Sequence, residues 1–205
     1  MSLYDALVKQ FGYNAPFMTK EIKYKNYSQP WIYKEIVKLR SEGKIIRFEK
    51  GIYYIPTKTI LGQSKLNPML VVEKKYLKNS GDTVGYLSGI SFLNSIGIST
   101  QVPSTFEIYT NNETSQVREV SVGKQKVILR KSRTKVTSDN VFVLSFLEMM
   151  NSVTPAFFNE ERTAAIKEYI KTNGITRQNI TKYAKDYPDK VMRNLIESEI
   201  IYEFA

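Results

Sequence analysis

The stretch 17–56 constrains the fold most strongly, because start and stop signals divide it into two helices and a hairpin. Thr19 is placed to cap a first helix, and Ser28 is placed to cap a second helix that ends at Gly43. Residues 45–55 place two short apolar segments on either side of a Gly-containing turn, which predicts a β-hairpin. Helix, turn, helix and hairpin in this order are typical of a winged helix-turn-helix, whose second helix enters the major groove of DNA.

The second predicted helix has one apolar side, formed by Ile32, Ile36 and Leu39, so its other side faces solvent. We expect Trp31 to pack in the core rather than stack at the surface. Solvent-facing Gln can pair with adenine, while Tyr, Lys and Arg can reach base edges or phosphates. For any single Lys, the alternative is a solvated surface charge. The predicted DNA-binding residues are Lys20, Lys23, Gln29, Tyr33, Lys34, Lys38, Arg47 and Lys50.

Composition narrows the possible classes of function. The chain has 205 residues, 42% of them hydrophobic, so it can bury a core in one large domain or two small ones. It contains no Cys and no His, which excludes disulfides, zinc fingers and Ser-His-Asp triads. No apolar run approaches the length of a membrane span, and the first residues lack the pattern of a signal peptide. We therefore expect a cytoplasmic protein with no membrane partner.

The net charge of +10 is unevenly distributed. Residues 1–56 carry ten Lys and Arg against five Asp and Glu, and residues 57–150 carry twelve against seven. Residues 151–205 carry eight of each. A basic excess attracts polyanions, which makes nucleic acid the leading class of partner for the first two segments. The alternative is that the charge only keeps the protein soluble.

The fold class predicted from these patterns is α+β. A winged helix-turn-helix at 1–56 and a polar linker at 57–67 precede a larger mixed domain at 68–205. In that domain we expect a small antiparallel sheet from strands at 105–110, 117–122 and 126–131. The predicted helices cover residues 68–77, 87–96, 141–150, 159–172, 176–187 and 189–201. We expect the Met149-Met150 pair to form core rather than an interaction face, and likewise the aromatic residues Phe142, Phe146, Phe157 and Phe158.

Two features of the mixed domain invite a functional interpretation. Its glycines Gly85, Gly89 and Gly97 match no phosphate-binding loop, so we interpret them as positions of close packing. The densest basic run of the chain lies on and around the last predicted strand, where it could grip nucleic acid or an acidic partner, or could simply be solvated. This candidate interaction surface consists of Lys124, Lys126, Arg130, Lys131, Arg133 and Lys135.

The chain resembles the AbiEi family of antitoxins from type IV, or abortive infection, toxin–antitoxin systems. The resemblance begins at the end of the predicted hairpin, Lys50–Pro56. It is most specific in the block Tyr86–Asn94, followed by Gly97 and the sequence Thr-Gln-Val-Pro at 100–103. A strand ending in Thr-Asn at 110–111 completes it, and the C-terminal helices fit less sharply.

This resemblance implies an N-terminal winged helix-turn-helix joined to a C-terminal antitoxin domain. Such a protein represses its own operon by binding inverted repeats in promoter DNA. It also opposes a nucleotidyltransferase-like toxin encoded alongside, without needing a stable complex with it. The DNA-reading role then falls on Gln29, Tyr33, Lys34 and Lys38, with Arg47 and Lys50 on the wing. No motif known for the family fixes the antitoxic residues, so the basic run at 124–135 is the candidate antitoxin surface.

Two other classes of function remain open at this point. The first is a stand-alone winged-helix regulator whose C-terminal domain binds a ligand or forms oligomers. The second is an enzyme that acts on nucleic acid. A nucleotidyltransferase needs a Gly-Ser pair and closely spaced carboxylates for metal ions, whereas Glu107, Glu113 and Glu119 lie apart in the sequence. We therefore expect a non-enzymatic protein with no cofactor and no catalytic metal site.

Overall fold

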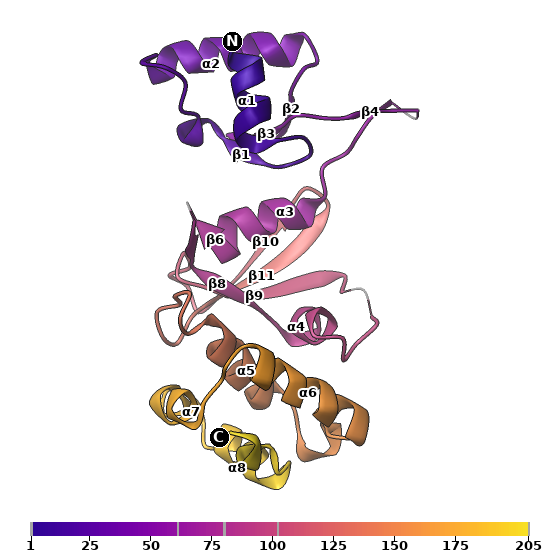
Figure 1. Ribbon diagram of the computed structural model, residues 1–205, viewed down its shortest axis with the longest axis vertical. Helices are drawn as coiled ribbons and strands as arrows, with labels where there is room; N and C mark the ends of the chain where they lie inside the picture. The colour runs from indigo at the N-terminus through magenta and orange to yellow at the C-terminus, as the bar shows by residue number, and fades with distance from the viewer. Residues whose placement is uncertain (1, 61, 80, 102, 205) are drawn as a thin grey trace. The chain divides into compact units, whose positions relative to one another are not determined.

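A computed structural model describes residues 2–60, 62–79, 81–101 and 103–204 (Figure 1). The chain divides into two compact units, Met1–Lys74 and Lys75–Ala205. Both units combine helices with strands, so the predicted α+β class is confirmed. The expectations for Ser80, at the end of a predicted helix, and for Val102, within the Thr-Gln-Val-Pro sequence, lie outside the described residues.

Up to residue 56, the first unit contains two α-helices and a three-stranded antiparallel sheet in the order β1-β3-β2. Helix α1 begins after Ser2 because that residue forms a capping box with Asp5, in which each side chain accepts from the other residue's backbone N–H. The elements are α1 (Leu3–Phe11), β1 (Phe17–Met18), the 3₁₀ turn η1 (Thr19–Glu21), α2 (Gln29–Ser41), β2 (Ile46–Glu49) and β3 (Ile52–Tyr54).

Helix α2 has the predicted limits. Ser28 precedes it as the N-cap, and Gly43 follows it in the left-handed conformation with φ +68°. Its apolar side packs into the core of the first unit, where Phe17 is fully buried and stacks on Phe11 with ring centroids 4.8 Å apart. This packing determines which side of α2 faces solvent.

The helix predicted after Thr19 is reduced to the single turn η1, and this prediction is wrong in length. Thr19 lies inside the turn, while the Met18 N–H donates to the Glu21 carboxylate at 2.7 Å. The segment that follows is not helical because it buries alternate residues. Ile22 and Tyr24 are buried, whereas the residues between and after them are exposed, as in an extended chain.

The segment predicted as a linker, 57–67, is hydrogen-bonded to the first unit. It carries a short hairpin of β4 (Lys58–Thr59) and β5 (Gly62–Gln63). The Tyr54 hydroxyl donates to the Ser64 carbonyl at 3.1 Å, and the Gln63 amide donates to the Gly43 carbonyl at 2.8 Å. The predicted helix 68–77 is present as α3 (Pro68–Val72), which continues into a π-helical turn, η2 (Glu73–Leu77).

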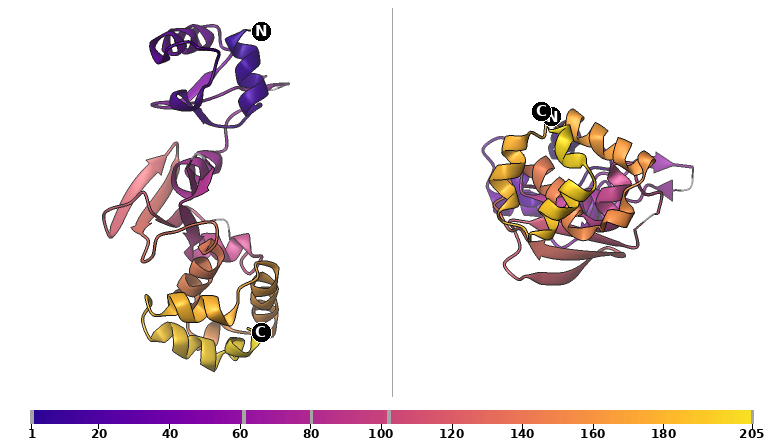
Figure 2. Two further views of the ribbon diagram at one scale, coloured as in Figure 1. Left: turned by 60° about the vertical axis from the view of Figure 1, so that its left-hand side comes forward. Right: turned by 90° about the horizontal axis from the view of Figure 1, so that it is seen from below.

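The second unit is built from a four-stranded sheet and a group of helices (Figure 2). Its strands are β6 (Lys78–Asn79), β7 (Asp82–Thr83), β8 (Gly85–Ser88), β9 (Thr105–Thr110), β10 (Val117–Val122) and β11 (Gln125–Lys131). Its helices are α4 (Gly89–Ser95), α5 (Val141–Ser152), η3 (Pro155–Phe157), α6 (Glu160–Thr172), α7 (Arg177–Ala184), α8 (Lys190–Glu197) and η4 (Ile200–Glu203).

The larger sheet has the strand order β10-β11-β9-β8. Two of its three strand pairs, β10 with β11 and β8 with β9, are antiparallel. The first of these pairs was predicted, whereas β8 was not predicted as a strand. The third pair, β9 with β11, is parallel. The reason is that the β10–β11 hairpin docks on β9 through its second strand, and this arrangement makes β11 run in the same direction as β9.

Helix α5 is the centre of the second core, and it contacts β8, α4, α7 and α8. Phe146, Met149 and Met150 are buried, as predicted. Phe142 was expected in the core but is 45% exposed. It lies in the first turn of α5, where the ring of Tyr169 covers only one edge of it at 6.5 Å.

The helix predicted from Leu87 begins two residues later, at Gly89, because Leu87 belongs to β8. The interpretation of these glycines as positions of close packing is confirmed at Gly85 but not at Gly97, where a Cβ atom would meet nothing within 4 Å. Gly89 and Gly97 instead adopt positive φ angles of +56° and +76°. A Cβ atom at Gly85 would lie 2.1 Å from the Tyr76 carbonyl oxygen, which no side chain can tolerate. Within the described residues, none of the helices is both long and apolar enough to cross a membrane.

Candidate functional site

The predicted DNA-binding residues all lie in the first unit and all are exposed. Gln29 opens α2, and three more residues follow along the exposed side of the helix. Lys20 lies on η1, which contacts α2, and Lys23 follows it in the extended segment. Along α2 itself the contributing residues are Gln29, Tyr33, Lys34 and Lys38.

The exposed face of α2 is partly organised by a hydrogen bond from η1. The Thr19 hydroxyl donates to the Tyr33 hydroxyl oxygen at 3.1 Å, while half of the Tyr33 side chain stays in solvent. Val37 lies one turn further along the same face and is 56% exposed. Sequence reasoning missed Val37. Its signal was a β-branched residue off the apolar stripe, and in a DNA-reading helix such a residue can contact a thymine methyl group.

The hairpin β2–β3 presents the two remaining predicted residues. Arg47 lies on β2, where its Nε donates to the Glu49 carbonyl at 3.3 Å. Lys50 occupies the turn, which closes through Gly51 in the left-handed conformation with φ +81°. Both side chains are exposed, so the hairpin offers a basic edge and tip.

An aromatic stack lies at the start of α2. Trp31 is only partly buried, and its ring stacks on Tyr27 at 3.9 Å and on Tyr24 at 5.9 Å. The prediction that Trp31 packs in the core rather than stacking is therefore half right, because the ring does both. Lys25 adopts φ +48° and places its ammonium over the two tyrosine rings, 5.1 Å and 5.8 Å from their centroids.

The basic run of the second unit is divided by the fold. Lys124 lies in the turn between β10 and β11, and Lys126 pairs with Glu119 on β10 at 3.4 Å. Lys135 is exposed beyond the strand. The other three cations, at the far end of β11, line a pocket of about 530 Å³. The pocket lining consists of Tyr109, Gln116, Val117, Arg130, Lys131, Ser132, Arg133 and Asp186.

Strand register explains why the pocket residues meet. Tyr86 on β8 is the partner of Tyr109 on β9, Tyr109 is the partner of Arg130 on β11, and Arg130 is the partner of Val117 on β10. Partners at one register position share one face of the sheet. The rings of Tyr86 and Tyr109, stacked 5.4 Å apart, therefore lie on the same face of the sheet as Arg130.

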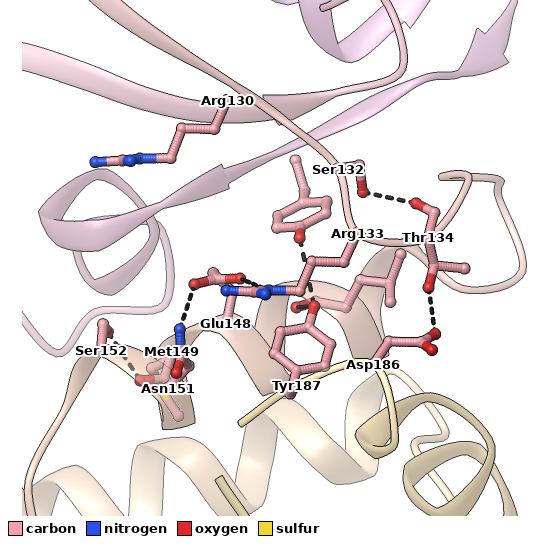
Figure 3. A network of polar contacts seen from close by, with 12 residues as sticks. Arg130, Ser132, Arg133, Thr134, Glu148, Met149, Asn151, Ser152, Asp186 and Tyr187 are labelled. Atoms are coloured by element: carbon pink, nitrogen blue, oxygen red, sulfur yellow. Dashed lines mark hydrogen bonds and ion pairs between the residues drawn. The ribbon is translucent and has the colours of Figure 1, made fainter. Parts of the chain in front are cut away.

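Beside this row lies a buried carboxylate, that of Glu148 on α5, which is 3% exposed (Figure 3). Its Oε1 accepts from the Asn151 amide at 2.9 Å, and its Oε2 lies 3.6 Å from Arg133 Nε without a hydrogen-bond partner. Burial, together with this carboxylate, raises the pKa of Tyr109 to about 12. Burial also raises the pKa of Tyr86 and of Tyr187, so these hydroxyls stay protonated at neutral pH.

The loop after β11 is tied to the helices. The Ser132 hydroxyl donates to the Thr134 carbonyl at 2.6 Å, and the Thr134 hydroxyl donates to the Asp186 carboxylate at 2.6 Å. The Arg133 guanidinium lies over the Tyr187 ring, 5.2 Å from its centroid. Figure 3 shows this loop and its partners side by side. These contacts position Arg133 and the loop that carries it.

Sequence reasoning identified the basic residues of this pocket but not the groups around them. Glu148 had a signal, because it is the only charged residue in the apolar segment 141–150. Tyr109 also had a signal in the sequence, namely the alternation of residue types along its strand. Asp186 had none, since it lies 52 residues from its partner Thr134. Among the described residues, no group of three or more Asp and Glu gathers as a metal site would require.

Similarity to a protein family extends over both candidate sites. A search of the curated proteins finds no match to the chain. A family model, described as a family of unknown function (DUF6088), matches residues 17–146. The matched region spans every predicted site residue of both units, from Lys20 to Lys135, and it covers more than half of the sequence. The chain therefore belongs to the DUF6088 family.

Proposed function

We propose that this protein is a DNA-binding antitoxin that represses its own promoter and counteracts a nucleotidyltransferase-like toxin encoded beside it. In this proposal residues 1–56 act as a winged helix-turn-helix. The observation that carries DNA binding is the exposed face of α2, where Tyr33, Lys34, Val37 and Lys38 lie in solvent while the opposite side is buried. The antitoxin role is supported by the resemblance to the AbiEi family in sequence.

The proposed mechanism of repression is positional. Cationic side chains on η1, α2 and the hairpin contact phosphates and fix the register, while the first turns of α2 read base edges. A single module of this size has limited contact area, so two copies on an inverted repeat supply the specificity. No reaction is catalysed in this mechanism. Metal-dependent turnover of nucleic acid by the purified protein would contradict that part of the proposal.

Promoter binding tests the DNA-facing surface. Fluorescence anisotropy with a fragment of the protein's own promoter, at salt concentrations from about 50 to 200 mM, gives both the affinity and its salt slope. Lys34→Ala combined with Arg47→Ala should weaken binding by about tenfold and reduce the salt slope by about two, because two phosphate contacts are lost.

The matched control removes two charges from exposed positions of the same unit, with Lys9→Ala and Lys65→Ala. It should change the affinity by less than about twofold, since distant charges act only through the screened field of the protein. If both double variants weaken binding equally, the attraction is a general charge effect and α2 is not the reading surface.

Growth rescue tests the antitoxin role separately. The full-length protein, co-expressed with the toxin encoded beside it, should restore growth. The Lys34→Ala, Arg47→Ala variant should lose repression of a promoter reporter and still restore growth, because the proposal assigns neutralisation to the second unit. If the wild-type protein represses the reporter but does not restore growth, the protein is a regulator and the antitoxin role is wrong.

A further inference from the structure

The basic pocket at the end of β11 has the features of a site for a small anion. It has a volume of about 530 Å³, within the range of ligand-binding clefts. Three cationic residues, Arg130, Lys131 and Arg133, belong to its lining, together with one acidic residue, Asp186. A concave site with an excess of one sign of charge concentrates ions of the opposite sign.

The ion pairs of the two arginines are loose. Arg130 Nε lies 3.6 Å from the Glu107 carboxylate, and Arg133 Nε lies 3.6 Å from that of Glu148. Charge-assisted hydrogen bonds between such groups are about 2.7–2.9 Å long. Neither carboxylate therefore saturates its guanidinium. The planar fork of donors on each arginine stays available to a second acceptor, and phosphate oxygens match its geometry.

The neutral donors of the pocket point to the same class of ligand. The Tyr109 hydroxyl remains protonated at neutral pH, so it can act as a hydrogen-bond donor to an anion. Gln116 adds an amide donor to the lining, whereas the Ser132 hydroxyl already donates to the Thr134 carbonyl. Since phosphate esters present several oxygens around one centre, they can accept from the cations and from these neutral groups together.

The pocket is also organised before any ligand enters. The loop that carries Ser132 and Arg133 is tied at Thr134 to Asp186 at 2.6 Å, and Arg133 is stacked on Tyr187. A site whose donors are already fixed loses little conformational entropy on binding. An extended surface that grips a long polymer does not need this enclosure, which favours a small ligand over duplex nucleic acid.

We propose that this pocket binds the phosphate groups of a small phosphorylated molecule, such as a nucleoside di- or triphosphate, with Arg130, Lys131 and Arg133 as the principal contacts. The site lies entirely within the second unit and does not depend on DNA binding by the first. It gives the protein a ligand-responsive part in addition to its proposed role as repressor and antitoxin.

Isothermal titration of the full-length protein tests this proposal, with inorganic pyrophosphate and ATP as probes in magnesium-free buffer. Both probes should bind saturably with one site per chain. Arg130→Gln combined with Lys131→Gln should weaken both by at least about tenfold, because two charge-assisted contacts are lost. Arg133 is left in place, since its removal would strand the buried Glu148 carboxylate and destabilise the fold.

The control variant removes the same number of charges from the same basic run, through Lys124→Gln and Lys135→Gln, which lie outside the pocket lining. It should alter the affinity for pyrophosphate by less than about twofold. Circular dichroism and the melting temperature establish that each variant is folded.

Three results would overturn the proposal. The first is no saturable binding of either probe by the wild-type protein. The second is an equal loss of binding in both double variants, which would reveal a general attraction of anions. The third is a loss of promoter affinity in the Arg130→Gln, Lys131→Gln variant without any binding of pyrophosphate, which would assign these residues to nucleic acid.

Discussion

Both units carry an excess of positive charge, +7 in residues 1–74 and +3 in residues 75–205, but they arrange it in opposite ways. In the first unit, Lys34 and Lys38 lie on an exposed helix face and form no ion pair with any residue the structure describes. In the second unit, Arg130 and Arg133 are each opposite a carboxylate at 3.6 Å and lie in a pocket. An excess of positive charge therefore does not by itself define the kind of partner.

This difference separates two kinds of anion recognition. Flexible, exposed lysines on a convex element suit a long polyanion, because affinity comes from many screened contacts and from counterion release. Partly neutralised arginines held in a concave site suit a small anion, because the geometry is fixed before binding. The predictions below test whether the two units are as independent, and as different, as this comparison requires.

The largest effect is expected from Phe17→Ala in the core of the first unit. Phe17 is fully buried and stacks on Phe11, so its removal should lower the free energy of unfolding by about 3–5 kcal/mol. Trp31, the only tryptophan of the chain, reports unfolding of this unit through its fluorescence in urea. Promoter binding should be lost, while pyrophosphate binding should stay within about twofold, because the second unit has its own core.

Tyr13→Ala is the control for that experiment, since it truncates an aromatic residue of the same unit that is 50% exposed. It should change the unfolding free energy by no more than about 0.5 kcal/mol. If Phe17→Ala abolishes pyrophosphate binding as well, the two units do not fold independently and the comparison between them fails.

A smaller effect is expected from Glu113→Gln in the turn between β9 and β10. The Glu113 carboxylate is nearly inaccessible and accepts from the N–H groups of Thr114 and Ser115 and from Arg118 Nε. Its loss should cost about 1–2 kcal/mol of unfolding free energy at pH 7. Circular dichroism in urea should show the shift, and the fluorescence transition of Trp31 should not. Glu119→Gln, which removes an exposed partner of Lys126, should cost less than about 0.5 kcal/mol.

The effect of Glu113 should depend on pH in a defined direction. Burial acts to raise its pKa, but the hydrogen bonds from Ser115 and Arg118 outweigh burial and hold the pKa below its usual value of 4.5. A carboxylate with a lowered folded-state pKa stabilises the fold above the unfolded-state pKa, and that stabilisation is lost as pH falls through the folded-state pKa. The difference between wild type and Glu113→Gln should therefore shrink below pH 4.5. A difference that stays constant to lower pH would contradict this assignment.

Local features of the fold were predictable from sequence because local physics fixes them. The start of α2 after Ser28, the left-handed Gly43 and the apolar stripe of α2 all depend on neighbouring residues. The prediction of a helix after Thr19 is wrong because the segment buries alternate residues, Ile22 and Tyr24, and this burial holds it extended. The strands of the larger sheet were found, but the parallel pairing of β9 with β11 is a long-range choice that no local pattern encodes.

The same distinction applies to the candidate sites. Residues on one exposed helix face, such as Lys34 and Lys38, could be grouped from spacing alone. The pocket could not, because Tyr109, Arg130 and Asp186 come from separate elements that only the tertiary fold brings together. The basic run at 124–135 was recognised as one surface, yet half of it lines a pocket and half does not.

The smallest effect is expected from Glu107→Gln, which removes the carboxylate opposite Arg130. The pair is 3.6 Å apart and its acid is 37% exposed, so it contributes little to stability. Without the competing charge, the Arg130 guanidinium should bind an incoming anion more strongly, and pyrophosphate affinity should rise by about two- to fivefold. Promoter affinity should not change. A rise in promoter affinity without one for pyrophosphate would show that Arg130 faces nucleic acid, and the two units would then differ in geometry but not in partner.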